Sequence, residues 1–372
     1  MIRDIQVLRA LAIMLVIYAH LGFLFTWSSK WYQQTAPFIN GWTGVDLFFV
    51  ISGFVISREL LAIKQSNSTT LFTNFAVPFW LKRAFRILPS AWFWATFGMI
   101  AAFAPTIFVG AGTVFNDFFQ WLTILLQLGN VYYASCIPAC GASDSVFYTV
   151  YWSLGLEEQF YLVLPIVIWY ASRKQLIVVL SVLIAVQFFI HRPQVPLNSL
   201  WYFRSDGLAW GVLIAIANTY PERLFLTSKL MSNFPARACV FTMLVILLVG
   251  MPSTGLPMAT GLVAAMGAAL VYLGSKDRNY FSVGPVLSPV LEWIGGRSFG
   301  IYLIHLPAFG LTHWILSSEH TGITIYKDKH TLLFVGVAFC ITCCLSEANY
   351  QLLEKPFRRY GRKWATEVQA TP

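Results

Sequence analysis

The 372-residue sequence contains little charge, because only 11 % of its residues are Asp, Glu, Lys or Arg, against about a quarter in soluble domains. Hydrophobic residues make up 57 % of the chain, and apolar runs cover nearly its whole length. No stretch between these runs is long enough for a soluble domain of ordinary size. The composition therefore excludes a soluble protein and predicts an all-α integral membrane protein.

Cysteine and histidine are also scarce, with six of each. Their positions show no spacing typical of a metal site, so we predict no metal. Cys136 and Cys140 lie in a loop expected outside the membrane, where both a disulfide and two free thiols fit the sequence. The net charge is +9, but the basic residues lie at the ends of apolar runs and form no clustered soluble face. We therefore expect no nucleic-acid partner.

The apolar runs predict about ten transmembrane helices. The expected spans are residues 6–25, 43–63, 88–109, 152–171, 175–190, 200–217, 238–250, 255–274, 298–316 and 331–350. The distribution of Lys and Arg between the loops places both termini in the cytoplasm. Because no small-residue cleavage site follows the first run, we expect that run to be retained as a helix.

Two short segments complete the expected topology. The apolar stretch near 118–128 is too short to cross, so we expect an interfacial or re-entrant helix there. Pro89 is expected in the first turn of the third span, where proline is tolerated. Residues 1–352 would then form one polytopic domain, and residues 353–372 a basic cytoplasmic tail.

The first span carries two ionisable residues, Arg9 and His20, eleven positions apart. Eleven helical steps return to within roughly 20° of the starting direction and rise about 16 Å. The two side chains therefore share one helix face, with Arg9 near the cytoplasmic interface and His20 well past the midplane. An ionisable group at that depth faces a protein interior or a wet cavity. His20 is thus a candidate catalytic residue, although a packing histidine and an interfacial Arg9 are the alternatives.

The other ionisable residues of the spans lie at two levels. Arg83 and Arg86 share a helix face on the cytoplasmic side, where they suit phosphate recognition or simple membrane anchoring. The outer level holds Asp46, Glu157, Glu158, Arg204 and Asp206, and His305 is a second buried imidazole near the middle of its span.

The outer carboxylates have more than one interpretation. Asp46 or a glutamate of the fourth span would orient His20, and the residues alone do not choose between Glu157 and Glu158. Asp46 would otherwise be a helix-dipole acid. Arg204 and Asp206 are interpreted as neutralising each other, and His305 as either functional or packed.

This arrangement predicts a reaction that bridges the membrane, with a phosphate-bearing donor at the cytoplasmic mouth and an acceptor outside. A histidine can act as the general base of such a transfer. The alternative is an exporter of a saccharide or acyl carrier, in which His20, Asp46 and Glu157 form a proton relay. No matched pair of broken spans indicates the inverted repeats of a transporter.

Seven motifs occur in order along the chain. They are Arg9 with ten residues before His20, GVDLFFVISGF at 44–54, KRAFRILP at 82–89, WSLGLEEQFY at 152–161, FRSDGL at 203–208, SFGIYLIH at 298–305 and EKP at 354–356. Together they resemble the membrane acyltransferase-3 family, the bacterial O-acetyltransferases of surface polysaccharides.

The resemblance implies roles for particular residues. His20 would be catalytic, assisted by Asp46 and by Glu157, which is the acid of the family motif. Arg9, Arg83 and Arg86 would hold the acyl-coenzyme A. The residues expected near the acceptor are Trp152, Tyr161, Arg204, Asp206 and His305.

The resemblance also implies a donor, an acceptor and a location. The donor would be cytoplasmic acetyl-coenzyme A, and the acceptor a saccharide such as lipopolysaccharide O-antigen, exopolysaccharide or peptidoglycan. The chain would lie among the lipids of the bacterial cytoplasmic (inner) membrane as a multi-pass protein. Some members carry a fused extracytoplasmic hydrolase-like domain, and we expect this chain to be of the stand-alone type. No oligomeric state follows from these motifs.

Overall fold

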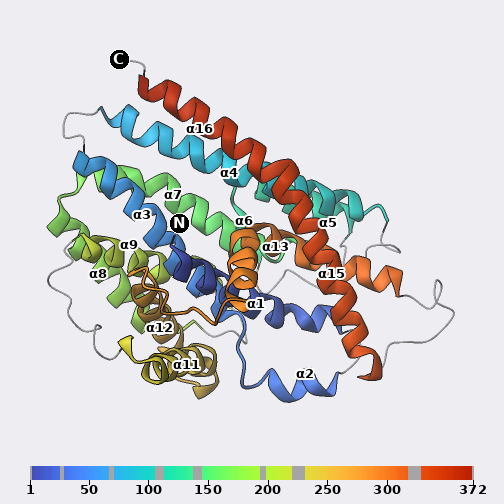
Figure 1. The fold of residues 1–372 in the computed structure, drawn as a ribbon. Coiled ribbons are helices and arrows are strands. Elements are labelled where there is room, and N and C mark those ends of the chain that lie inside the picture. Colours follow the sequence, from blue (N-terminus) through green and yellow to red (C-terminus); the bar gives the residue numbers. More distant parts are fainter. Residues whose placement is uncertain are drawn as a thin grey trace.

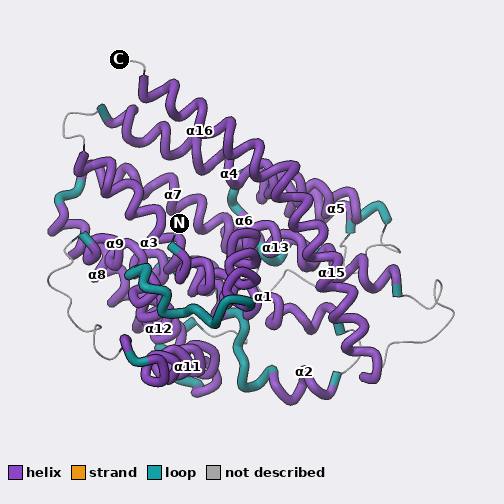
Figure 2. The backbone as a smooth tube through the Cα atoms, viewed as in Figure 1, coloured by secondary structure: helices purple, strands orange, loops and turns teal. Residues whose placement is uncertain are grey.

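The computed structural model describes residues 2–25, 29–66, 71–104, 113–136, 145–192, 198–219, 231–316 and 328–370. These residues form helices and short connections, with no β-strand among them (Figure 2). The predicted all-α class is therefore confirmed for the described part of the chain.

Each predicted span overlaps one of the longer helices, which are labelled in Figure 1. These are α1 (Arg3–Leu24), α3 (Thr43–Ser66), α4 (Phe72–Ala101), α7 (Tyr151–Tyr170), α8 (Arg173–Phe189), α9 (Asp206–Asn218), α11 (Phe234–Gly250), α12 (Ala259–Gly274), α13 (Leu287–Ile315) and α15 (Thr331–Asn349). The remaining elements are α2 (Lys30–Thr35), α5 (Val114–Leu125), α6 (Gly129–Cys136), α16 (Lys355–Ala370) and the short helices η1 (Val146–Tyr148), η2 (Ser199–Phe203), η4 (Met251–Thr254), η5 (Asp328–His330) and η6 (Tyr350–Glu354).

Three described helical segments are long and apolar enough to cross a membrane by themselves, namely Arg3–Leu24, Phe234–Thr254 and Thr331–Val368. Helix α12 is apolar but shorter, with 16 residues. Helices such as α3 and α4 carry more charge within their length, and part of that charge is paired inside the bundle. The ten crossings and the cytoplasmic termini therefore stay a prediction.

Helix α4 begins at Phe72, well before the expected span, so Pro89 lies in the middle of a 30-residue helix. The expectation that Pro89 occupies a first turn is wrong. The basic stretch before it interrupts the apolar run, but the helix continues because Lys82 and Arg83 both pair with Glu59 of α3.

Most of the segment predicted to be a basic tail, residues 353–372, forms helix α16, which lies along α4 (Figure 1). Gly361 permits the close approach, because a Cβ there would lie 2.6 Å from the Phe85 Cβ. The Trp364 ring also packs on Phe85, with 5.4 Å between ring centroids. This segment is therefore part of the folded bundle.

Helix α3 lies at the centre of the bundle and packs most extensively against α9, with α1, α7 and α12 around it. A Cβ at Gly53 would overlap the Leu208 carbonyl oxygen, and one at Gly211 would overlap that of Val50. Glycine at these two positions lets the backbones touch, as in closely packed membrane helices.

The short helix expected near 118–128 is observed as α5, which begins at Val114 and has 12 residues. At 1.5 Å per residue it is about 18 Å long, too short for a hydrocarbon layer of about 30 Å. Cys140 and the side chain of Cys136 lie outside the described residues.

Candidate functional site

A cavity lies between α1, α3, α4, α7 and α13, with about 780 Å³ of space when the part open to solvent is included. The charged residues in its wall are Arg9, Arg83, Arg86 and Glu157, and its hydroxyl groups come from Ser52, Ser153, Tyr161, Ser298 and Tyr302. The structure thus brings the three predicted phosphate-binding arginines to one wall, together with one predicted carboxylate.

The three arginines differ in their partners. The Arg83 guanidinium is paired with Glu59, with 2.7 Å between Nη2 and Oε2, and it also lies over the Phe79 ring. Arg9 and Arg86 form no hydrogen bond or ion pair with another described residue. Glu157 interacts electrostatically with both arginines. Two guanidinium groups with one carboxylate still leave the cavity positive, and an anion there would offset the remaining repulsion.

The carboxylate of Glu157 is held by two hydroxyl groups. It accepts a hydrogen bond of 3.1 Å from Ser52 Oγ on α3 and one of 2.9 Å from the Tyr161 hydroxyl one turn along α7. Glu158 does not line the cavity. Of the two adjacent glutamates, Glu157 is therefore the one that faces the predicted site.

Arg358 is a further cation near this site, and the sequence analysis placed it in the tail. It interacts electrostatically with both Arg9 and Arg86. It reaches them because α16 packs along α4, and because Glu354 of the EKP motif, one helical turn before it, is buried in the bundle. The four-residue spacing from Glu354 to Arg358 places the two side chains on one helix face. This spacing is the sequence signal that could have indicated which way Arg358 points.

His20 lies near the other end of α1 and outside the cavity wall. Its Nδ1 is 3.0 Å from Nε2 of His305, which is fully buried on α13. Neither Asp46 nor Glu157 forms a hydrogen bond with His20 among the described residues. The ring of Tyr302, which lines the cavity, has its centroid 6.2 Å from that of His305. The histidine pair therefore lies just beyond the Tyr302 side of the cavity.

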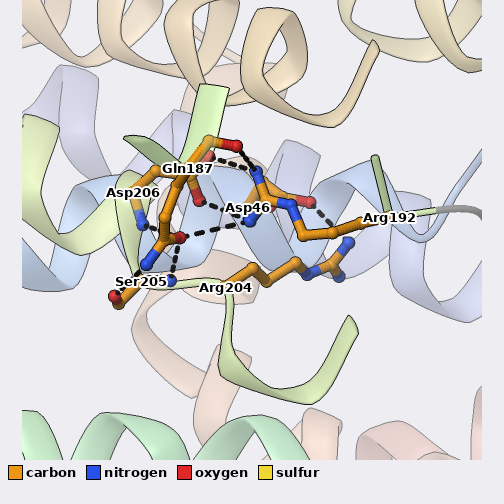
Figure 3. Close-up of polar contacts among 6 residues, drawn as sticks. All are labelled: Asp46, Gln187, Arg192, Arg204, Ser205 and Asp206. Carbon is orange, nitrogen blue, oxygen red and sulfur yellow. Dashed lines mark hydrogen bonds and ion pairs between the residues drawn. The ribbon is translucent and has the colours of Figure 1, made fainter. Parts of the chain in front are cut away.

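A second polar cluster lies between α3, α8 and α9 (Figure 3). Asp206 accepts a 2.7 Å hydrogen bond from Arg192, and Arg204 lies 3.5 Å from Asp46. The interpretation that Arg204 and Asp206 neutralise each other is therefore wrong. Arg204 precedes α9 in extended backbone, whereas Asp206 begins the helix, so the two side chains reach different partners.

Arg204 is enclosed by aromatic rings. Its guanidinium carbon lies 3.9 Å from the Trp201 centroid and 5.0 Å from the centroids of Trp42 and Trp152. Asp46 and Arg204 are almost fully buried and face away from the cavity. Of the predicted site residues, the structure thus separates Asp46, Trp152, Arg204 and Asp206 from the arginine cavity.

Comparison with protein families gives one match across nearly the whole chain. The acyltransferase-3 family model, described as an acyltransferase domain, matches residues 2–348. This chain belongs to the acyltransferase-3 family. The family is membrane-embedded, which agrees with the apolar helices of the described residues.

Curated relatives in the acyltransferase-3 family include the peptidoglycan O-acetyltransferase OatA of Listeria monocytogenes, 29 % identical over 96 % of this chain and 56 % of the relative. YrhL of Bacillus subtilis, named as a candidate peptidoglycan O-acetyltransferase, is 28 % identical over 95 % of this chain and 54 % of the relative. The chain thus spans about half the length of these relatives. No solved structure matches it.

Within the described residues, no group of three or more His, Cys, Asp or Glu side chains is placed to hold a metal ion. The acyltransferase-3 motifs instead converge on the arginine cavity and the histidine pair. Arg9 and His20 come from the first motif, Arg83 and Arg86 from the third, and Glu157 from the fourth.

Proposed function

We propose that this chain is a membrane O-acyltransferase that moves an acetyl group from cytoplasmic acetyl-coenzyme A to a hydroxyl of a saccharide outside the membrane. The observation that carries the proposal is the cavity, whose wall holds Arg9 and Arg86 without an ion pair to a described residue and contains more cations than carboxylates. The diphosphate and the 3′-phosphate of coenzyme A supply anions that guanidinium groups bind in a bidentate manner.

The distance along α1 suits an extended donor. Arg9 and His20 are eleven residues apart, which corresponds to a rise of about 16 Å. An extended acyl-pantetheine arm would lie between them, with its thioester toward His20. The cavity side chains on this route carry hydroxyl groups, including the Ser153 and Tyr302 pair at 2.6 Å.

His20 is the proposed general base. Its Nε2 would take the proton of the acceptor hydroxyl while the hydroxyl oxygen forms a bond to the thioester carbonyl carbon. The carbon–sulfur bond then breaks, and the coenzyme A thiolate takes the proton from the imidazolium. The products are the saccharide ester, free coenzyme A and a neutral histidine.

The relatives favour peptidoglycan as the acceptor, because two of them carry that substrate in their names. We therefore place peptidoglycan before O-antigen, with the chain in the bacterial cytoplasmic membrane. The relatives extend well beyond the matched region, so only the transfer step described here is proposed for this chain.

The geometry offers less support for the exporter. A proton relay needs His20, Asp46 and Glu157 within hydrogen-bond reach of one another or of bridging water. In the described residues, Asp46 is paired with Arg204, and Glu157 is held by Ser52 and Tyr161.

The test uses purified protein in lipid nanodiscs with [14C]acetyl-coenzyme A and a peptidoglycan tetrasaccharide, and measures label in the saccharide and release of coenzyme A. We expect His20→Gln to abolish both. Transfer by a folded His20→Gln protein would remove His20 as the base.

The donor site is tested with Arg86→Gln. Losing a hydrogen bond to a charged group costs about 1.5–3 kcal/mol, so the KM for acetyl-coenzyme A should rise about 10- to 150-fold. The KM for acetyl-pantetheine, which lacks the nucleotide phosphates, should not change. Arg58→Gln, at an exposed position of α3, is the matched control. An equal rise for both donors would contradict a phosphate site.

A further inference from the structure

We infer that His305 is a positioning residue that holds His20 with its proton on Nδ1 and leaves Nε2 as the base. The inference rests on the proposed function of His20. It is carried by a continuous chain of hydrogen-bonding groups that starts at a backbone carbonyl of α13 and ends at the open nitrogen of His20.

The chain begins at the carbonyl oxygen of Ile301, which lies 3.2 Å from Nδ1 of His305. A carbonyl oxygen only accepts hydrogen bonds, so Nδ1 of His305 carries a proton. In a neutral imidazole the other nitrogen, Nε2, is then an acceptor.

Nε2 of His305 lies 3.0 Å from Nδ1 of His20. Because Nε2 is the acceptor of this pair, Nδ1 of His20 is the donor and carries its proton. The contact with His305 therefore favours the tautomer of His20 with its proton on Nδ1, and Nε2 of His20 carries the lone pair.

The opposite arrangement would require a charged His305 that donates from both nitrogens. His305 is fully buried, and its ring neighbours are Tyr302, Phe309 and His20. No described carboxylate forms an ion pair with it. Burying an unpaired charge is costly, so the neutral ring with its proton on Nδ1 is the stable form.

The two imidazole rings also differ in how firmly the surrounding side chains fix their orientation. His305 lies within α13, which packs along α1, and aromatic rings fix its orientation. His20 is only partly buried, and its Nε2 forms no hydrogen bond with another described residue. A fixed acceptor beside a more accessible base is the arrangement that sets the tautomer of a catalytic imidazole.

Two variants of His305 separate the loss of the acceptor from the loss of the ring. In His305→Gln the amide oxygen can occupy the place of Nε2 and accept from His20, whereas His305→Leu offers no acceptor. We expect His305→Leu to lower kcat at least tenfold, up to the 10²- to 10⁴-fold contribution of a general base. His305→Gln should restore most of kcat, and the KM for acetyl-coenzyme A should stay unchanged in both.

His313 provides the matched control on the same helix. It is buried, and its Nε2 lies 3.3 Å from the Phe23 carbonyl of α1. His313→Leu therefore removes a buried imidazole that contacts the same helix but not the base. We expect its kcat to remain within about twofold of the wild-type value.

The tautomer is measured directly by ¹⁵N NMR of histidine-labelled protein in nanodiscs, with the His20 signals assigned by their loss in His20→Gln. We expect a protonated Nδ1 in the wild type and a mixture of tautomers in His305→Leu. A wild-type His20 protonated on Nε2, or a kcat of His305→Leu near that of the wild type, would overturn the inference. If the wild type transferred no acetyl group, the proposed function would fail, while the NMR result would still decide the tautomer.

Discussion

The ion pair between Asp46 and Arg204 predicts that Asp46 stabilises the fold. The two side chains are 1 % and 0 % exposed, and their closest atoms are 3.5 Å apart. Neither the Asp46 oxygens nor the Arg204 nitrogens form a hydrogen bond with a described residue. Each charge therefore depends on the other and, for Arg204, on the surrounding tryptophan rings.

The change to make is Asp46→Ala, which leaves the buried Arg204 guanidinium without its ion-pair partner. Breaking a buried pair from one side costs about 3–5 kcal/mol, whereas replacing both partners by apolar groups is often neutral. We therefore expect Asp46→Ala to lower the free energy of unfolding by about 3–5 kcal/mol. The double variant Asp46→Ala/Arg204→Met should recover most of that loss.

The assay is unfolding in mixed micelles by SDS titration, followed by tryptophan fluorescence. Glu367→Ala is the control, because the Lys363 and Glu367 side chains are 74 % and 61 % exposed, and removing a pair at such a site costs about 1 kcal/mol or less. An Asp46→Ala protein that unfolds like the wild type but transfers no acetyl group would refute the structural role and support the catalytic one.

Two further predictions concern α16 and the contact between α3 and α9. Arg358→Gln should raise the KM for acetyl-coenzyme A at least several-fold, because Arg358 lies near Arg9 and Arg86. Arg359→Gln, at the exposed neighbouring position, should leave this KM unchanged. If both variants had the same KM in the nanodisc assay, Arg358 would be excluded from the donor site. Gly211→Val should lower stability by about 1–3 kcal/mol or more, because a Cβ there overlaps the Val50 carbonyl oxygen. Gly336→Ala, with open space around its Cβ, should stay within about 1 kcal/mol of the wild type in the same SDS titration.

The helices and much of the cavity could be predicted from the sequence because both depend on local spacing. Apolar runs of suitable length marked each long helix of the described part. The offset of eleven positions from Arg9 to His20 and that of three positions from Arg83 to Arg86 set which side chains share a face. The cavity that contains Arg9, Arg83 and Arg86 is where these faces meet.

The pairing of charges could not be predicted, because it depends on which helices become neighbours. His20 and His305 are 285 positions apart, and no periodicity relates them. Arg204 and Asp206 are close in sequence, but Arg204 precedes α9 and Asp206 is its first residue. Their side chains therefore pair with other residues, Arg204 with Asp46 and Asp206 with Arg192. The start of α4 was misplaced for a similar reason, since Glu59 of α3 pairs with two of the three cations that interrupt its apolar run.

One pair of helices supplies both ends of the proposed route. On α13, Ser298, Tyr302 and His305 follow each other at intervals of four and three residues, so they form one face. That face meets the face of α1 that carries Arg9 and His20, because the two helices pack along each other.

The SFGIYLIH motif thus has a physical explanation in the contact between α1 and α13. Its serine and tyrosine line the cavity, and its histidine contacts His20. Gly300 faces the other way, where a Cβ would lie 3.1 Å from Asn349 Nδ2 and 3.2 Å from Glu354 Oε1. Helix α1 carries Arg9 and His20, and α13 carries two of the cavity hydroxyl groups and His305. A shift of one helix along the other would therefore change how the arginines of the cavity are placed relative to the histidine pair. The alignment of these two helices is therefore the structural requirement on which the proposed transfer depends.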